Sequence, residues 1–252
     1  MTDNANATIP LCWICGKDLA TTGEHGTKRT DLRDAFGIVT QGQPLFLHDA
    51  KRRNRRVGSL DAKPLKLPGK LCPKCNNERT QPHDMAWEKL SAGLRACKPA
   101  IGPGTIIWPK RIFGADRAQE MLNVHLFFVK LFGCHIAGNN ITIDLTGLAE
   151  AIKTGKPHPC VYLNFGSVHM FGGQPHVGAT DMWTTPPDAS GFSSFATWFY
   201  DLDFMSINVL YAEPGEKRQG LVGAWHPRDG ANRLVISNFS KHGGADDPSK
   251  EA

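Results

Sequence analysis

The sequence predicts an α+β protein, in which a small zinc-bound module at the N-terminus is followed by a mixed α/β domain. Two observations lead to this prediction. Four of the seven cysteines fall in two C-x-x-C pairs, a spacing typical of tetrahedral zinc sites. Further along the chain, helix-like apolar patterns alternate with short segments rich in β-branched and aromatic residues. The 252 residues suffice for two small domains or one large one with a hydrophobic core.

The cysteine pairs are the first chemical signal. Each pair would supply two zinc ligands from a tight turn, and Gly16 would permit the backbone reversal of the first turn. The other three cysteines are isolated, so the odd total favours a metal site in a reducing compartment over a disulfide framework. We expect a structural Zn²⁺ on four thiolates: Cys12, Cys15, Cys72 and Cys75.

Charge and composition divide the chain. Residues 1–98 carry 17 Lys and Arg against 10 Asp and Glu, whereas the whole chain has a net charge of +5. The excess of positive charge in the first part suggests a polyanionic partner there. The Pro- and Gly-containing stretch 99–109 reads as a linker, 110–240 as an α/β accessory domain, and 241–252 as a flexible tail.

The predicted helices follow from apolar spacing and from cap residues. Trp87, Leu90, Leu94 and Cys97 form an amphipathic stripe after the second cysteine pair. Residues 116–136 form a second helix, for which Gly133 is the predicted C-cap. A third helix is expected between an N-cap at Asp144 and a stop at Gly155. The predicted strands lie in three segments: 160–171, 204–213 and 233–239.

No basic segment followed by an apolar run opens the chain. The longest apolar stretch, "VHLFFVKLFG", is too short and too charged to span a bilayer. We therefore expect a cytoplasmic protein that has no contact with a membrane.

Two polar motifs flank the predicted zinc site. "GEHGTKRTDL" places Glu24 beside His25 between the cysteine pairs, and Asn76 and Asn77 follow the second pair at once. Simpler roles stay open for these residues. Asn76 could cap the next helix, and Glu24 and His25 could be an exposed pair without function. Asp84 suits an N-cap or a salt-bridge partner better than a metal ligand.

The order of a cysteine pair, "EH", and a second cysteine pair followed by Asn resembles the zinc-containing subset of the HNH nuclease family. The resemblance covers about residues 12–90. It implies a treble-clef module of the ββα-metal type, in an Asn-ended variant. By that resemblance Glu24 and Asn76 would ligate a catalytic Mg²⁺ or Mn²⁺, and His25 would be the general base that activates water.

The carried-over roles agree with the chemistry of the residues. Mg²⁺ prefers oxygen ligands and accepts one or two from the protein, and a histidine can take a proton near neutral pH. Because a regular strand places Glu24 and His25 on opposite faces, a shared site requires a twist or a bulge. The family's orienting Asn before the second cysteine pair is missing from "KPLKLPGKLC". Asn77 or Asp84 is the predicted substitute that would hydrogen-bond His25.

Basic residues near these motifs suit contacts with nucleic-acid phosphates. The predicted contacts are Lys28, Arg29, Arg33, Lys51, Arg52, Arg53, Arg55, Arg56 and Arg79. The sequence thus favours a metal-dependent endonuclease that acts on nucleic acid, with DNA preferred over RNA as the substrate. The alternatives are a non-catalytic zinc-stabilised nucleic-acid-binding module and a subunit of a larger assembly. A homodimer is also compatible with the sequence.

Overall fold

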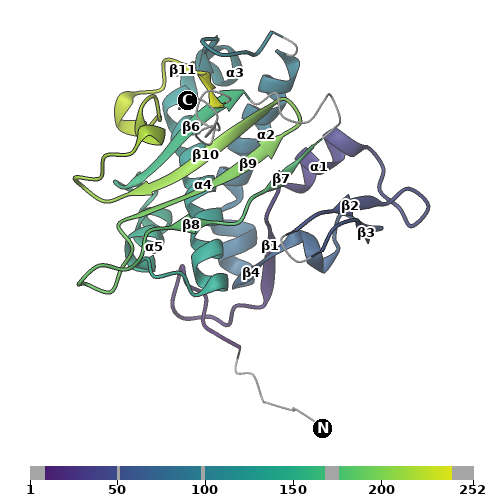
Figure 1. The fold of residues 1–252 in the computed structure, drawn as a ribbon, viewed down its shortest axis with the longest axis horizontal. Coiled ribbons are helices and arrows are strands. Elements are labelled where there is room, and N and C mark those ends of the chain that lie inside the picture. The colour runs from purple at the N-terminus through teal and green to yellow at the C-terminus, as the bar shows by residue number, and fades with distance from the viewer. Residues whose placement is uncertain (1–8, 50–51, 98–99, 168–175, 240–252) are drawn as a thin grey trace, which may run out of the picture.

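The computed structural model describes residues 9–49, 52–97, 100–167 and 176–239, and these residues form the predicted α+β fold (Figure 1). The predicted tail at 241–252 lies outside the described residues. The first part of the chain contains the elements between and after the cysteine pairs: β1 (Thr22–His25), α1 (Arg29–Phe36), β2 (Leu45–Leu47), β3 (Arg55–Val57), η1 (Lys63–Leu65), β4 (Lys66–Leu71), η2 (Lys74–Arg79) and α2 (Gln81–Ala96).

The second part consists of two main helices, several short helical turns, a six-stranded sheet and a separate two-stranded sheet. Its helices are α3 (Pro109–Phe113), η3 (Gly114–Asp116), α4 (Arg117–Asn139), α5 (Leu145–Thr154), η4 (Gln219–Leu221) and η5 (Pro227–Asp229). Its strands are β5 (Ile106–Ile107), β6 (Val161–Ser167), β7 (Gly178–Ala179), β8 (Trp183–Thr184), β9 (Phe195–Leu202), β10 (Met205–Ala212), β11 (Leu234–Val235) and β12 (Ser237–Asn238).

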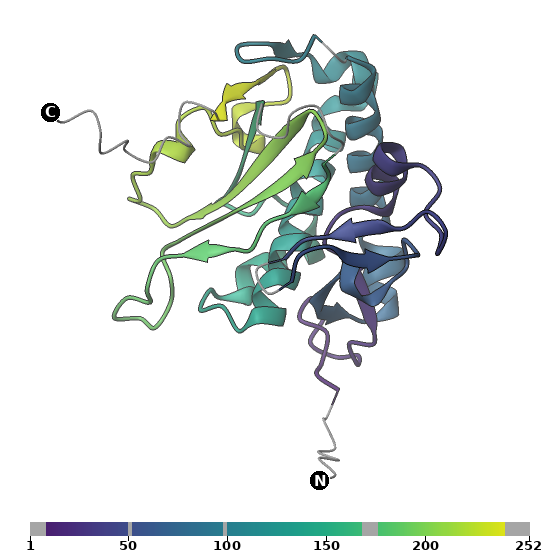
Figure 2. The same cartoon turned by 45° about the vertical axis from the view of Figure 1, so that its right-hand side comes forward.

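A largely antiparallel sheet covers α4 on one side (Figures 1 and 2). Its strand order is β12-β6-β10-β9-β7, and β8 also pairs with β9. β6, β10 and β9 form antiparallel ladders, whereas β12 runs parallel to β6. Every residue of the central strand β10 is buried, because the strand has neighbours on both edges, α4 lies behind the sheet, and Leu210 and Ala212 pack in a separate cluster with Leu221 and Ala224.

α4 is the central helix of the molecule. It contacts α2 and β4 of the first part as well as α5 and the sheet of the second. The helical stretch Pro109–Asn139 is long and apolar enough to cross a membrane, but 83% of its most apolar window is buried inside the protein. Such burial fits the core helix of a soluble protein.

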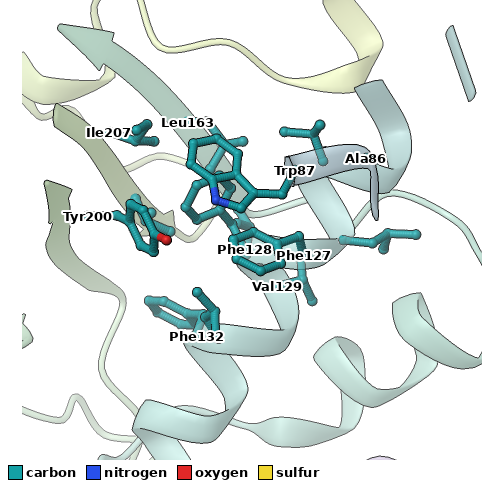
Figure 3. Packing of buried hydrophobic residues seen from close by; sticks show 14 of the residues in the cluster. Ala86, Trp87, Phe127, Phe128, Val129, Phe132, Leu163, Tyr200 and Ile207 are labelled. Atoms are coloured by element: carbon teal, nitrogen blue, oxygen red, sulfur yellow. The ribbon is translucent and has the colours of Figure 1, made fainter. Parts of the chain in front are cut away.

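The hydrophobic core is continuous across the predicted linker. Trp87 of α2 stacks on Phe127 of α4 with ring centroids 5.5 Å apart, and Tyr200 of β9 meets the same indole edge-on at 5.3 Å (Figure 3). Residues from Cys12 to Ile236 belong to this single cluster. The stretch 99–109 contains β5, which pairs with β11. The division at residue 98 therefore separates parts that share one core.

Two close contacts involve glycines of α4, one with backbone and one with a side chain. A Cβ atom at Gly138 would collide with the backbone of Gly69 on β4, so both residues must lack a side chain for the helix and strand to approach this closely. A Cβ atom at Gly133 would collide with the Trp13 ring. The predicted C-cap at Gly133 is wrong, since the helix continues to Asn139 and ends at Asn140 in the left-handed conformation. Because Gly133 has no side chain, the Trp13 indole can pack against the helix at this position.

The signals for α5 are confirmed by the structure. The Asp144 carboxylate accepts a hydrogen bond from the Thr146 backbone N–H, which is the expected N-cap. Gly155 ends the helix with φ of 66°. The stripe predicted for α2 is also present, because Trp87, Leu90 and Leu94 are buried, although Cys97 is exposed.

Candidate metal and nucleic-acid site

The four cysteines of the two C-x-x-C pairs lie together. Their sulfur atoms all fall within 4.8 Å of one another, and Cys15 Sγ lies 3.8 Å from Cys72 Sγ. Zinc–sulfur bonds of about 2.3 Å in a tetrahedron put the sulfurs roughly 3.8 Å apart, so the donor set fits Zn²⁺. Gly16 has φ of 65° and its N–H donates to the Cys12 carbonyl, which closes the first turn as predicted.

The thiols of this cluster differ in acidity. Burial alone would raise the pKa of the Cys15 thiol, but backbone hydrogen bonds at Asp18 and Lys17 and the neighbouring thiols lower the pKa to about 7. Burial raises the pKa of Cys72 and Cys75. A raised pKa favours the protonated thiol. A bound cation would favour the thiolate instead, because a thiol that coordinates zinc is deprotonated.

A π-helical turn, η2, connects the second cysteine pair to α2. The Thr80 N–H donates to the Cys75 carbonyl, five residues back, which is the hydrogen bond of a π-helix. The Thr80 hydroxyl donates to the carbonyls of Cys75 and Asn76. Asn76 thereby comes to lie in the wall of a pocket, with its Oδ1 atom buried and without a hydrogen-bond partner. A buried acceptor without a donor costs free energy, which a bound cation would recover.

A bulge in β1 brings Glu24 and His25 to the same pocket. β1 pairs with β4 through Gly23 and Lys70, and then through His25 and Lys66, so the register shifts between Gly23 and His25. An irregularity of this kind re-aims side chains that would otherwise point to opposite faces. Glu24 is buried and His25 is half-buried, and both line the pocket.

The hydrogen bond that orients His25 comes from an unpredicted partner. His25 Nε2 lies 2.9 Å from the backbone carbonyl oxygen of Leu60. Because a carbonyl only accepts, Nε2 must donate, and Nδ1 is then the basic atom of the neutral ring. The predicted donor or acceptor for His25, either Asn77 or Asp84, is therefore corrected: Leu60 fills that role through its main chain.

Asp84 is engaged by two lysines. The ammonium group of Lys130, a fully buried residue of α4, lies 2.7 Å from Asp84 Oδ1 and 3.2 Å from Glu24 Oε1. Lys28 lies 3.3 Å from Asp84 Oδ1 and also 3.3 Å from Glu88 Oε1. Burial alone would lower the pKa of Lys130, but the carboxylates of Glu24 and Asp84 raise it, so the buried ammonium stays charged.

These residues enclose a pocket of about 270 Å³. The side of the pocket nearest α1 carries Lys28 and Arg29, and Arg29 pairs with Asp61 at 3.2 Å. Oxygen donors, an imidazole and two cationic groups thus converge on one space, a set that suits a divalent cation and a phosphate. The pocket is lined by Gly23, Glu24, His25, Lys28, Arg29, Asp61, Asn76, Asn77 and Asp84.

The remaining predicted basic contacts are spread over the surface. Arg52, Arg53, Arg55 and Arg56 are exposed on and beside the β2–β3 hairpin, and Arg33 is exposed on α1. Arg79 is half-buried and donates to Cys75 Sγ at 3.5 Å, so its guanidinium faces the cysteine cluster. The prediction for Lys51 lies outside the described residues.

Lys130, Leu60 and Asp61 are site residues that sequence reasoning missed. Leu60 acts through its carbonyl, and no side-chain pattern marks a carbonyl. Lys130 carries a weak signal, since it is the only charged residue within the apolar run "VHLFFVKLFG". A charge in a core helix requires a partner, and here the partners are the pocket carboxylates.

Comparison with known proteins yields no relative. No family model, no curated protein and no solved structure matches the chain.

Proposed function

We propose that this protein is a cytoplasmic, metal-dependent endonuclease that hydrolyses phosphodiester bonds in nucleic acid, with DNA as the preferred substrate. The observation that carries the proposal is an oriented base that shares a pocket with two oxygen donors, of which Asn76 Oδ1 has no hydrogen-bond partner among the described residues. His25 is fixed by Leu60, and Glu24 and the partnerless Asn76 Oδ1 line the same pocket. The resemblance to the HNH nuclease family assigns the same three residues.

Each residue has a chemical task in this proposal. Lys28 and Arg29 bind the phosphate at the mouth of the pocket. His25 Nδ1 accepts a proton from the attacking water, as a neutral imidazole can near pH 7. Glu24 and Asn76 would hold Mg²⁺ or Mn²⁺, and the bound ion would supply charge stabilisation for the phosphoryl and leaving-group oxygens. Zn²⁺ on the four cysteines is a structural ion, because four thiolates complete its coordination.

A second candidate function is a zinc-stabilised nucleic-acid-binding module or assembly subunit without catalysis. The ion pair of Lys130 with both Glu24 and Asp84 favours it, because the carboxylates are already neutralised. The exposed arginines of the β2–β3 hairpin would serve either function.

One experiment separates these functions. Wild type and His25→Ala are incubated with supercoiled plasmid and Mg²⁺ or Mn²⁺, and binding to the same DNA is measured without divalent ions. We expect nicking that falls by about 10² or more in His25→Ala while binding is retained. His48→Ala, at an exposed histidine outside the pocket, is the control and should cut normally. Binding without cleavage would support the nucleic-acid-binding module, and a protein that neither binds nor cuts would contradict both nucleic-acid functions and favour the assembly subunit.

A further inference from the structure

Lys130 lies behind the wall of the pocket, and its positive charge offsets the negative charge of the pocket carboxylates. The side chain is fully buried and comes from α4, in the part of the chain beyond the predicted linker. Its ammonium contacts one oxygen of Glu24 and one of Asp84. A buried ammonium in this position must be neutralised by carboxylates, and both of its partners belong to the pocket.

The charges that face the pocket then come close to balance. Its lining carboxylates are Glu24, Asp61 and Asp84, and its lining cations are Lys28 and Arg29. Lys130 supplies a third positive charge from behind. Glu88 pairs with Lys28 outside the lining. A cation-binding protein site normally gathers a surplus of negative oxygen ligands, and this pocket has none.

We propose that Lys130 is a positioning residue that makes divalent-cation binding depend on the phosphate of the nucleic acid. The inference rests on the proposed nuclease function. Without substrate, the ammonium repels a dication and holds the Glu24 oxygen that would otherwise bind it. A phosphate that docks on Lys28 and Arg29 brings its own negative charge and further oxygen ligands. Metal and nucleic acid therefore bind together, with each raising the affinity of the other.

The test measures Mn²⁺ binding rather than cleavage. Free Mn²⁺ is titrated by its electron paramagnetic resonance signal, with and without a short DNA duplex, in the His25→Ala background so that the duplex stays intact. Mn²⁺ bound by the duplex alone is subtracted. With Lys130 present, we expect the duplex to raise the affinity for Mn²⁺ by about tenfold or more. Equal affinity with and without the duplex would overturn the proposal.

Substitution then assigns the effect to the lysine. Lys130→Met removes the charge, so Mn²⁺ affinity without DNA should rise by about tenfold and the effect of the duplex should shrink. Lys130→Arg keeps the charge and should keep the dependence on DNA. Unchanged or weaker Mn²⁺ binding by a folded Lys130→Met protein would refute the role. Zinc content and circular dichroism establish folding, and Lys130→Gln replaces Lys130→Met if the latter does not fold. If neither neutral variant folds, the effect of the duplex on the Lys130 protein decides alone.

The outcome is separable from the fate of the proposed function. If the protein cleaves DNA but its affinity for Mn²⁺ is the same with and without DNA, the nuclease function is supported and the inference about Lys130 is wrong. If the wild-type protein does not cleave DNA but its Mn²⁺ affinity depends on DNA and on Lys130, the nuclease function is wrong and the coupling of metal and phosphate binding is supported.

Discussion

The Tyr200 hydroxyl of β9 donates a hydrogen bond of 2.5 Å to the carboxylate of Asp31, a fully buried residue of α1. The same carboxylate accepts from Trp87 Nε1 at 2.8 Å and from Arg95 at 2.7 Å. The Tyr200 oxygen also accepts from the backbone N–H of Lys28. One buried carboxylate thus joins the sheet, α1 and α2, and the tyrosine reaches the residue that lines the pocket.

Removal of that hydroxyl should destabilise the protein. In Tyr200→Phe, Asp31 loses one of its donors and Lys28 N–H loses its acceptor, with a cost of about 2–3 kcal/mol in the free energy of unfolding. Denaturant titration measures the loss. Tyr162→Phe is the matched control, because the Tyr162 hydroxyl accepts from the exposed side chain of Arg228 and not from a buried network. Equal losses in the two variants would contradict the importance of the Asp31 network.

Loss of a cysteine ligand should abolish zinc binding and folding of the first part of the chain. Cys12→Ser removes one of four thiolates from a buried cluster, so we expect less than one zinc per chain and loss of cooperative unfolding. Cys97→Ser is the control, since Cys97 is exposed and lies outside the cluster. Metal analysis and thermal melts measure both. A Cys12→Ser protein that retains zinc and melts like wild type would disprove the site.

The salt dependence of nucleic-acid binding should decrease when arginines of the β2–β3 hairpin are replaced by alanine. Arg53→Ala with Arg55→Ala removes two exposed guanidinium groups, and each phosphate contact contributes roughly 0.9 to the slope of log K against log salt. We expect weaker binding to every DNA sequence and a slope reduced by about 2, measured by fluorescence anisotropy at several salt concentrations. Lys153→Ala with Lys156→Ala, at two exposed lysines near the end of α5, provides a charge-matched control. An unchanged slope would place the DNA elsewhere.

Acid should weaken the fold through buried histidines. Burial lowers the pKa of His83, His135 and His158 to about 4, so below about pH 6.5 the unfolded chain binds more protons than the folded chain. Stability should therefore fall as the pH drops from about 6.5 toward 4, by at most about 3 kcal/mol for each histidine.

His135 gives the cleanest test, because burial alone lowers its pKa and its ring packs 4.8 Å from Trp198. His135→Phe keeps a ring at the position and removes one titrating group. Urea titrations of the zinc-saturated protein between about pH 7 and pH 5 should show a shallower loss of stability. The exposed His48→Ala control should match wild type. Parallel curves for His135→Phe and wild type would contradict the prediction.

Local signals in the sequence predicted the parts of this structure that depend on neighbouring residues. The C-x-x-C spacing predicted each pair of thiols on its own turn, because a tight turn needs only its own residues, and the shared chemistry of the two pairs predicted that they meet. Asp144 and Gly155 predicted the ends of α5 for the same reason. Gly133 failed as a C-cap because a distant ring, Trp13, and not the local backbone, decides that position. β9 is a strand that the sequence patterns left unassigned, although "FATWFYDL" is rich in aromatic residues.

The candidate site was predicted in its motifs but not in its surroundings. Glu24, His25 and Asn76 were named from the sequence, and they do line one pocket. The bulge in β1 and the π-helical turn that make this possible have no clear sequence signature. Lys130 could not be assigned, because it follows Glu24 by more than a hundred residues and only the packing of α4 brings the two together.

The backbone contact between Gly69 and Gly138 limits where this chain could be truncated or recombined with another protein. β4 carries the strand partner of His25, and α4 carries Lys130, about two helical turns before Gly138. A fragment that stops at residue 98 would lose the ammonium between Glu24 and Asp84 and would expose the apolar side of Trp87. We therefore expect that residues 1–98 do not fold as a separate unit. Recombination that moved this segment into another protein would have to carry α4 along with it.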